Sequence, residues 1–224
     1  VVQQSQDGTR KYLWTLPDGE KIESVFIPSA GRRTLCISSQ VGCALGCTFC
    51  ATGTMGLRRN LKAWEIAVQA RESVLANPEE KPTNIVYMGM GEPLANYAAT
   101  SRSLRLLTDA RALGFSPRRI TVSTVGLVAG MERLAKEGLR VNLAISLHAT
   151  TNEARSRLMP VNKGVPLEAL LEACRRFPLP TRQRMTFEYV LLDGVNDSPE
   201  DARRLVRLLK GMRAKVNLIP FNEW

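Results

Sequence analysis

The chain has 224 residues, of which 44% are hydrophobic and 23% are charged, a composition typical of a globular protein with a substantial core. No apolar run is long enough to cross a bilayer, and the first residues do not form a signal peptide, so neither membrane attachment nor export is expected. The formal net charge of +10 favours a polyanionic partner, with nucleic acid as the leading class. A basic surface kept only for solubility is the alternative.

The chain begins with a predicted β-hairpin over 11–27, because Pro17-Asp18-Gly19 is strong turn chemistry between two β-prone segments. After it, segments with strand and helix patterns alternate. We expect six core strands, at 34–39, 84–88, 119–124, 141–147, 185–192 and 215–220. We expect helices at 63–76, through 104–113 up to Gly114, at 128–138, at 166–177 and after the cap at Ser198.

This alternation predicts an α/β fold with a parallel sheet built from right-handed crossovers. The polar residues of interest all fall where predicted strands end, which favours a partial (β/α)6 TIM-like barrel. A doubly wound sheet satisfies the same alternation, but it more often has a glycine fingerprint after its first strand. We expect residues 1–30 to form an N-terminal β-hairpin extension and residues 31–224 to form the core barrel.

Three of the five cysteines, Cys43, Cys47 and Cys50, follow the first core strand in the spacing Cys-x3-Cys-x2-Cys. Gly42 and Gly46 allow the tight turns that bring three thiolates together. Soft thiolates select iron–sulfur clusters or zinc, and three ligands leave one coordination position open for chemistry. A zinc site needs a fourth ligand, and the only histidine lies about a hundred residues away. Clustered thiols also predict a reducing, cytoplasmic setting.

Other polar groups stand at later strand ends, in the turn Gly89-Met90-Gly91-Glu92-Pro93 and at Ser123, Ser146 and His148. Glycines at a strand end allow a ligand to approach the backbone, and Glu92 can accept hydrogen bonds from an ammonium group. Each residue taken alone is more often a local cap or a satisfied polar group. Their shared location favours a ligand-binding shell. Cys174 lies on an apolar helix face and is expected in the core.

The cysteine motif, with Phe49 just before its last cysteine and an α/β barrel around it, resembles the radical S-adenosylmethionine enzymes. Further segments are similar to one family within that superfamily, the dual-specificity 23S rRNA and tRNA adenine-C2 methyltransferases. These segments are 7–11, 22–25, 34–43, 59–61, 88–94, 145–149, 192–197 and 217–222. The resemblance runs along essentially the whole chain. Two alternatives to a C2 methyltransferase remain. One is a close relative that methylates adenine C8, and the other is a zinc-dependent RNA-binding module without catalytic activity.

The resemblance implies a 4Fe-4S cluster on Cys43, Cys47 and Cys50, and S-adenosyl-L-methionine bound beside it. The implied cofactor-binding positions are Gly91, Glu92, Ser123, Ser146, Leu147, His148 and Asn222. It also implies that Glu23 is the general base and that Cys36 helps resolve a protein–RNA crosslink. From the residues alone, Glu23 reads as a solvated strand residue and Cys36 as a small buried one.

The implied reaction uses one S-adenosylmethionine to methylate a cysteine in a C-terminal tail and a second to generate the radical that activates this methyl group. This sequence has no candidate for that cysteine and none of the family's N-terminal RNA-binding accessory domain. We therefore expect it to be the core of a longer enzyme that cannot complete methyl transfer alone. Expected partners are 23S rRNA, tRNA and a flavodoxin-type electron donor, with no membrane and a monomeric state. Candidate phosphate contacts are Arg58, Arg59, Arg118, Arg119, Arg182 and Arg184.

Overall fold

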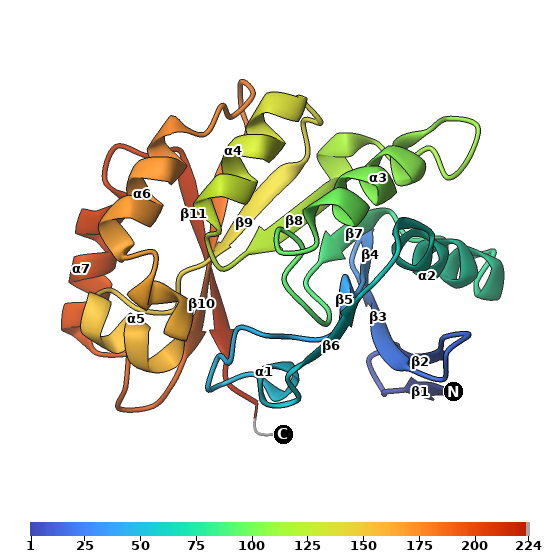
Figure 1. Ribbon diagram of the computed structural model, residues 1–224, viewed down its shortest axis with the longest axis horizontal. Helices are drawn as coiled ribbons and strands as arrows, with labels where there is room; N and C mark the ends of the chain where they lie inside the picture. The colour runs from blue at the N-terminus through green and yellow to red at the C-terminus, as the bar shows by residue number, and fades with distance from the viewer. Residues whose placement is uncertain (223–224) are drawn as a thin grey trace.

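The main sheet of the computed structural model, which describes residues 1–222, has nine strands and is drawn in Figure 1. Its strand order is β1-β2-β3-β4-β7-β8-β9-β10-β11. The strands are β1 (Val2–Gln4), β2 (Arg10–Thr15), β3 (Lys21–Ser29), β4 (Arg32–Cys36), β7 (Asn84–Tyr87), β8 (Ile120–Thr124), β9 (Asn142–Ser146), β10 (Met185–Leu191) and β11 (Ala214–Pro220). Strands β4 and β7 to β11 are parallel neighbours, and they match the six predicted core strands.

The predicted hairpin is present as β2 and β3, and it continues the core sheet because β3 pairs antiparallel with β4. Within the part of the chain that the structure describes, β1 and β11 are the two edges of the main sheet. The sheet is therefore a curved, open form of a barrel, as expected for a partial barrel. The division into two domains at residue 30 stays a prediction.

Helices that connect the parallel strands lie along the outer side of this sheet (Figure 1). They are α2 (Ala63–Ala76), α3 (Tyr97–Thr108), α4 (Val128–Glu137), α6 (Leu167–Arg176) and α7 (Pro199–Leu209). Buried side chains of the strands and helices, such as Ile85, Val122, Leu104 and Leu170, form one core cluster, and Cys174 is buried in it as predicted. No helix among residues 1–222 is long and apolar enough to cross a membrane.

Most predicted helices are confirmed, and the differences have local causes. Gly138 ends α4 in the left-handed conformation with φ of 65°, and the Ser198 hydroxyl accepts from the Asp201 N–H at the start of α7. Helix α3 ends at Thr108 instead of continuing to Gly114. The Asp109 carboxylate accepts a hydrogen bond from the Arg111 N–H, and such a turn competes with further helix.

Several short elements were not predicted. They are α1 (Ala51–Thr54), α5 (Asn152–Leu158), the 3-10 helices η1 (Pro117–Arg119) and η2 (Pro160–Lys163), and a second sheet of β5 (Gln40–Gly42) and β6 (Leu57–Asn60). Elements of three to seven residues are too short to give a clear hydrophobic period. The small sheet holds both ends of the cysteine loop, so a feature invisible in the sequence pattern supports the predicted site.

Candidate active site

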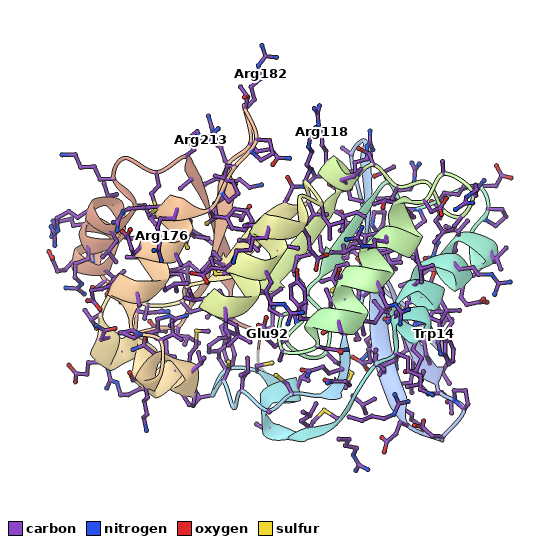
Figure 2. The ribbon with its side chains drawn as sticks, turned by 45° about the horizontal axis from the view of Figure 1, so that its top comes forward. Trp14, Glu92, Arg118, Arg176, Arg182 and Arg213 are labelled. Atoms are coloured by element: carbon purple, nitrogen blue, oxygen red, sulfur yellow. The ribbon has the colours of Figure 1, made fainter. Side chains whose placement is uncertain are left out.

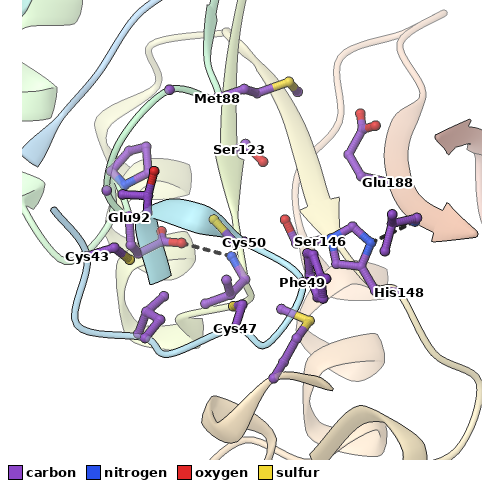
Figure 3. Close-up of a pocket in the computed structure, with 18 of the residues that line it drawn as sticks. Cys43, Cys47, Phe49, Cys50, Met88, Glu92, Ser123, Ser146, His148 and Glu188 are labelled. Atoms are coloured by element: carbon purple, nitrogen blue, oxygen red, sulfur yellow. Dashed lines mark hydrogen bonds between the residues drawn. The ribbon is translucent and has the colours of Figure 1, made fainter. Parts of the chain in front are cut away.

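A cavity of about 470 Å³ opens at the carboxyl ends of the parallel strands, and Figure 3 shows it in close-up. Its walls come from the cysteine loop and from the ends of β7, β8, β9, β10 and β11. Eight of the predicted site residues line it: Cys43, Cys47, Cys50, Gly91, Glu92, Ser123, Ser146 and His148. Residues distant in the sequence therefore meet in one place, because parallel strands bring their carboxyl ends to the same edge.

The cysteine loop is shaped by glycines and fixed by backbone hydrogen bonds. Gly42 has φ of 76°, and a Cβ atom on it would lie 1.9 Å from the Gly56 oxygen, so only glycine fits there. Gly46 has φ of 62° and also takes the left-handed conformation. The Cys43 N–H donates to the Gly56 oxygen over 2.9 Å, which closes the loop at its base. The predicted tight turns at both glycines are confirmed.

The three thiols are close enough to influence one another electrostatically. Burial raises the pKa of Cys43, and burial together with the neighbouring Cys50 and Cys43 raises the pKa of Cys47 to about 12. Among residues 1–222, no three His, Cys, Asp or Glu side chains stand close enough to hold a single metal ion. A four-iron cluster does not require the three thiols to meet at one ion, because each cysteine binds its own iron atom.

Glu92 lies at one side of the cavity with only 3% of its surface exposed. Its carboxylate accepts hydrogen bonds from the backbone N–H groups of Leu94 over 3.0 Å and Val125 over 2.9 Å. Desolvation nevertheless raises its pKa to about 7. A cationic ligand beside this carboxylate would compensate the buried charge, so the site favours an ammonium group.

The glycines around Glu92, which line the cavity, also have a packing role that was not predicted from the sequence. A Cβ atom on Gly91 would lie 2.4 Å from the Gln40 Cβ, and one on Gly89 would lie 2.8 Å from the Ile37 carbonyl carbon. The Gln40 side chain also accepts the Glu92 N–H over 2.8 Å. These glycines are thus needed for close packing against the segment that leads into the cysteine loop, a role that does not require a ligand.

His148 lies on the opposite side of the cavity from Glu92 (Figure 3). Its Nδ1 accepts the Val190 N–H over 2.9 Å, so the hydrogen of the neutral ring is on Nε2. Desolvation, with Arg155 nearby, lowers its pKa to about 3. The ring also meets Phe49 edge-on, with centroids 4.7 Å apart. His148 is therefore a neutral hydrogen-bond donor at physiological pH and not a proton acceptor.

Two predicted cofactor-binding residues do not line the cavity. The Leu147 side chain is fully buried, and its backbone N–H donates to the Glu188 oxygen. Asn222 is exposed just beyond the end of β11, at the edge where the cavity opens. Ser123 and Ser146 line the cavity from the ends of β8 and β9 (Figure 3).

Glu23 and Cys36 also lie outside the cavity lining, but the sheet places both near its edge. The Glu23 side chain is 42% exposed and forms an ion pair with Lys11 over 3.2 Å. The Ser38 hydroxyl donates to the Glu23 carbonyl oxygen, so Glu23 stands at the carboxyl end of the neighbouring β4. Cys36 ends β4, opposite Val25 of β3, and burial raises its pKa to about 12. Their predicted roles stay predictions.

Glu188, a carboxylate inside the cavity, was not predicted from the sequence. It lies on β10 beside His148, and its Oε2 accepts the Asn217 side-chain N–H over 2.6 Å. Its Oε1 has no hydrogen-bond partner among the described residues. Burial raises its pKa. The sequence signal that could have found Glu188 is a single charged residue inside the otherwise uncharged predicted strand at 185–192. In the structure it pairs with Ser146 in the parallel register.

Arg155 of α5, which is fully buried, was not predicted as a site residue either. Its guanidinium donates to the backbone oxygens of Val125, Ser146 and Leu147 and to the Asn162 side chain. Desolvation lowers its pKa to about 10. Five N–H donors in a planar fork suit this task, and they hold the ends of β8 and β9 together.

Comparisons with known proteins agree with this geometry. The dual-specificity RNA methyltransferase RlmN of Geobacter sulfurreducens is 59% identical over 220 residues, which are 98% of this chain and 60% of that protein. The RlmN of Syntrophobacter fumaroxidans is 56% identical over 221 residues, which are 98% of this chain and 64% of that protein. This chain thus spans less than two thirds of the length of these relatives.

A crystal structure of a radical SAM methyltransferase from Sphaerobacter thermophilus superposes with a TM-score of 0.93 at 50% identity. The superposition covers 100% of this chain and 66% of that one. The sequence model of the Radical SAM superfamily matches residues 37–206, which include the cysteine loop and most of the cavity lining. The match extends over more than half of the sequence, and the chain belongs to the Radical SAM superfamily.

Proposed function

We propose that this chain is the catalytic core of a radical S-adenosylmethionine methyltransferase that acts on C2 of an adenosine in 23S rRNA and in tRNA. The observation that supports this most directly is the meeting of three thiols, Glu92 and His148 in one cavity at the strand ends. The relatives named RlmN support the reaction and its RNA substrates.

The residues of the cavity fit the two implied cofactors. Cys43, Cys47 and Cys50 would hold the 4Fe-4S cluster, and Glu92 would bind the amine of S-adenosylmethionine. Ser123, Ser146 and the Nε2–H of His148 offer hydroxyl and N–H groups to the rest of that molecule. The chemistry supplied by the bound cluster is one-electron reduction of the sulfonium. The protein's own task is to orient the reactants and to exclude water.

We further propose that the substrate adenosine approaches over the edge occupied by Glu23. The carboxylate there is half exposed and can accept the proton from the ring carbon, while Cys36 on the adjacent strand assists product release. The adenosine must be unpaired or extruded to reach this edge. The methyl-carrying cysteine would come from the part of the relatives' length that this chain does not span.

We also propose that the protein is a cytoplasmic monomer and that it receives electrons from a donor of flavodoxin type. The donor is needed because the cluster must be reduced before each turnover. The clustering of Cys43, Cys47 and Cys50 in one loop supports a reducing environment.

Anaerobic reconstitution tests the core of the proposal. With iron, sulfide and a chemical reductant, the chain should bind about four iron atoms and release 5′-deoxyadenosine from S-adenosylmethionine. Cys47→Ser should abolish both, whereas Cys174→Ser should retain both. One equivalent of zinc with no iron–sulfur absorption would instead support the zinc-dependent RNA-binding module.

The position of the methyl group needs the complete gene. Expression in cells that lack their own enzyme, followed by mass spectrometry of rRNA and tRNA digests, should give 2-methyladenosine. Detection of 8-methyladenosine would replace the C2 assignment by the C8 alternative.

A further inference from the structure

Cationic side chains gather at the amino ends of β8, β9, β10 and β11, at the other end of these strands from the cavity. Figure 2 shows Arg118, Arg182 and Arg213 there, with Glu92 well away from them. We call this surface the basic rim. It consists of seven exposed residues, Arg118, Arg119, Arg140, Arg182, Arg184, Lys210 and Arg213.

None of the seven rim side chains forms an ion pair with a carboxylate among residues 1–222. The stretches 110–131, 138–152, 173–187 and 202–222, which enter these four strands, contain no Asp or Glu. Arg58 and Arg59 differ in this respect, although both are predicted phosphate contacts together with four of the rim arginines. Arg58 pairs with Glu20, and Arg59 pairs with both Glu65 and Asp18. The rim charges are therefore available to a polyanion.

The loops of the basic rim are held together by hydrogen bonds. The Asn142 side chain donates to the Arg118 oxygen over 2.8 Å, joining the entries of β9 and β8. The Arg213 guanidinium donates to the oxygens of Leu179 and Pro180, joining the entries of β11 and β10. A groove of about 660 Å³ lies between Arg118, Arg140 and the loop at 177–181. The charges thus stand on a fixed, hollowed surface.

Two rim arginines adopt the left-handed backbone conformation, which is unfavourable for residues that carry a Cβ atom. Arg140 has φ of 52° and Arg182 has φ of 69°. Glycine takes this region without strain, and among the other residues Asn and Asp take it most readily. Only three non-glycine residues within 1–222 have positive φ, and two of them are rim arginines. A long cationic side chain stands where glycine would fit the backbone better, which points to a use for the charge.

We propose that the basic rim binds the sugar-phosphate backbone of the RNA substrate, at a distance from the adenosine in the cavity. This proposal rests on the proposed function for the identity of the polyanion. The strands of five to seven residues separate the two ends by about 15–20 Å, and a folded RNA is large enough to span them. None of the large exposed hydrophobic side chains lies in the rim loops, which favours a hydrated polyanion over a lipid surface.

A double variant tests the proposal without relying on turnover. In Arg140→Gly/Arg182→Gly, both substitutions remove charge and relieve the left-handed backbone. Binding of a fluorescein-labelled tRNA transcript by the full chain, followed by anisotropy across a salt series, should weaken about tenfold, and the salt slope should fall by about two. The melting temperature should stay equal or rise, because glycine fits both positions.

The matched control is Arg102→Gln/Arg133→Gln, which removes two exposed charges from α3 and α4 outside the rim loops; like the rim arginines, neither forms an ion pair with a described carboxylate. An equal loss of affinity in this control would overturn the proposal, since net charge alone would then explain the binding. Unchanged tRNA binding in the rim variant would overturn it as well, and so would rim-dependent binding to anionic vesicles without an effect on tRNA. Reductive release of 5′-deoxyadenosine, measured on the same samples, tests the cavity separately and identifies which proposal fails.

Discussion

His148 is the single histidine of the chain, so its ionisation can be followed without interference from another imidazole. Its pKa is lowered from the ordinary 6.5 to about 3 in the folded state. Below pH 6.5 the unfolded chain binds a proton that the native state refuses, so the free energy of unfolding falls as the pH drops from about 6.5 toward 3. By pH 5 this group alone removes about 2 kcal/mol.

Urea unfolding of the cluster-free chain at pH 7 and pH 5 measures this effect, with His148→Asn as the reference. Asparagine tolerates positive φ, and its side-chain oxygen can accept the Val190 N–H, but it does not titrate in this range. The wild type should lose about 2 kcal/mol more than the variant. The same pH dependence in both proteins would show that His148 is already protonated at pH 5.

Glu188 allows a second test at the residue scale, on ligand binding. One carboxylate oxygen is held by Asn217, and the other is open to the cavity beside His148. In Glu188→Gln the bond to Asn217 can persist, while the charge facing the ligand is lost. We expect S-adenosylmethionine to bind about tenfold more weakly, as for a lost hydrogen bond to a charged acceptor. Equilibrium dialysis measures this, with the exposed Glu168→Gln on α6 as the control, and unchanged affinity would remove Glu188 from the ligand shell.

At the element scale, α5 contributes the group that holds two strand ends in place. Arg155→Met keeps much of the side-chain volume but removes the guanidinium donor from the carbonyl oxygens of Val125 and Ser146. The Leu147 oxygen loses the same donor but keeps its bond from the Ala149 N–H. We expect a loss of about 3 kcal/mol in the free energy of unfolding, together with weaker cofactor binding. Arg157→Met, on the exposed side of the same helix, should change stability by less than about 0.5 kcal/mol.

Denaturant unfolding of both variants measures the difference, and Arg155→Lys refines it. A lysine ammonium cannot reproduce the planar fork that reaches several acceptors, so it should restore only part of the stability. Full rescue by lysine would mean that the positive charge matters and that the hydrogen-bond geometry does not.

The helices and strands differ in how well they could be predicted from the sequence. The six core strands and α2, α4, α6 and α7 could be predicted because each has a clear hydrophobic period and a recognisable end, such as Gly138 or Ser198. Helix α5 could not, because seven residues give too little periodicity, and its main feature is a charged residue in the core. The close packing of the glycines beside Glu92 could not be predicted, because their neighbours, Ile37 and Gln40, come from a distant part of the chain.

At the scale of the whole molecule, the parallel sheet gives the chain two chemically different ends. The motif residues could be placed at one end from the sequence, since each follows a predicted strand. The sequence could not distinguish the arginines that form ion pairs from those that do not. Arg58 and Arg118 look alike in the sequence, yet Arg58 is paired with Glu20, whereas Arg118 on the basic rim has no ion-pair partner within the described part of the chain. Ion pairing depends on contacts between distant segments, which composition does not reveal.

The distance between these ends predicts that they bind their ligands independently. Sites more than about 10 Å apart with no shared partner usually have additive effects. Combining Glu92→Gln with Arg140→Gly/Arg182→Gly should therefore weaken S-adenosylmethionine binding as much as Glu92→Gln alone, and tRNA binding as much as the rim variant alone. The coupling free energy from dialysis and anisotropy should stay within about 0.5 kcal/mol of zero. A coupling above about 1 kcal/mol would mean that occupation of the cavity is transmitted along the strands to the rim.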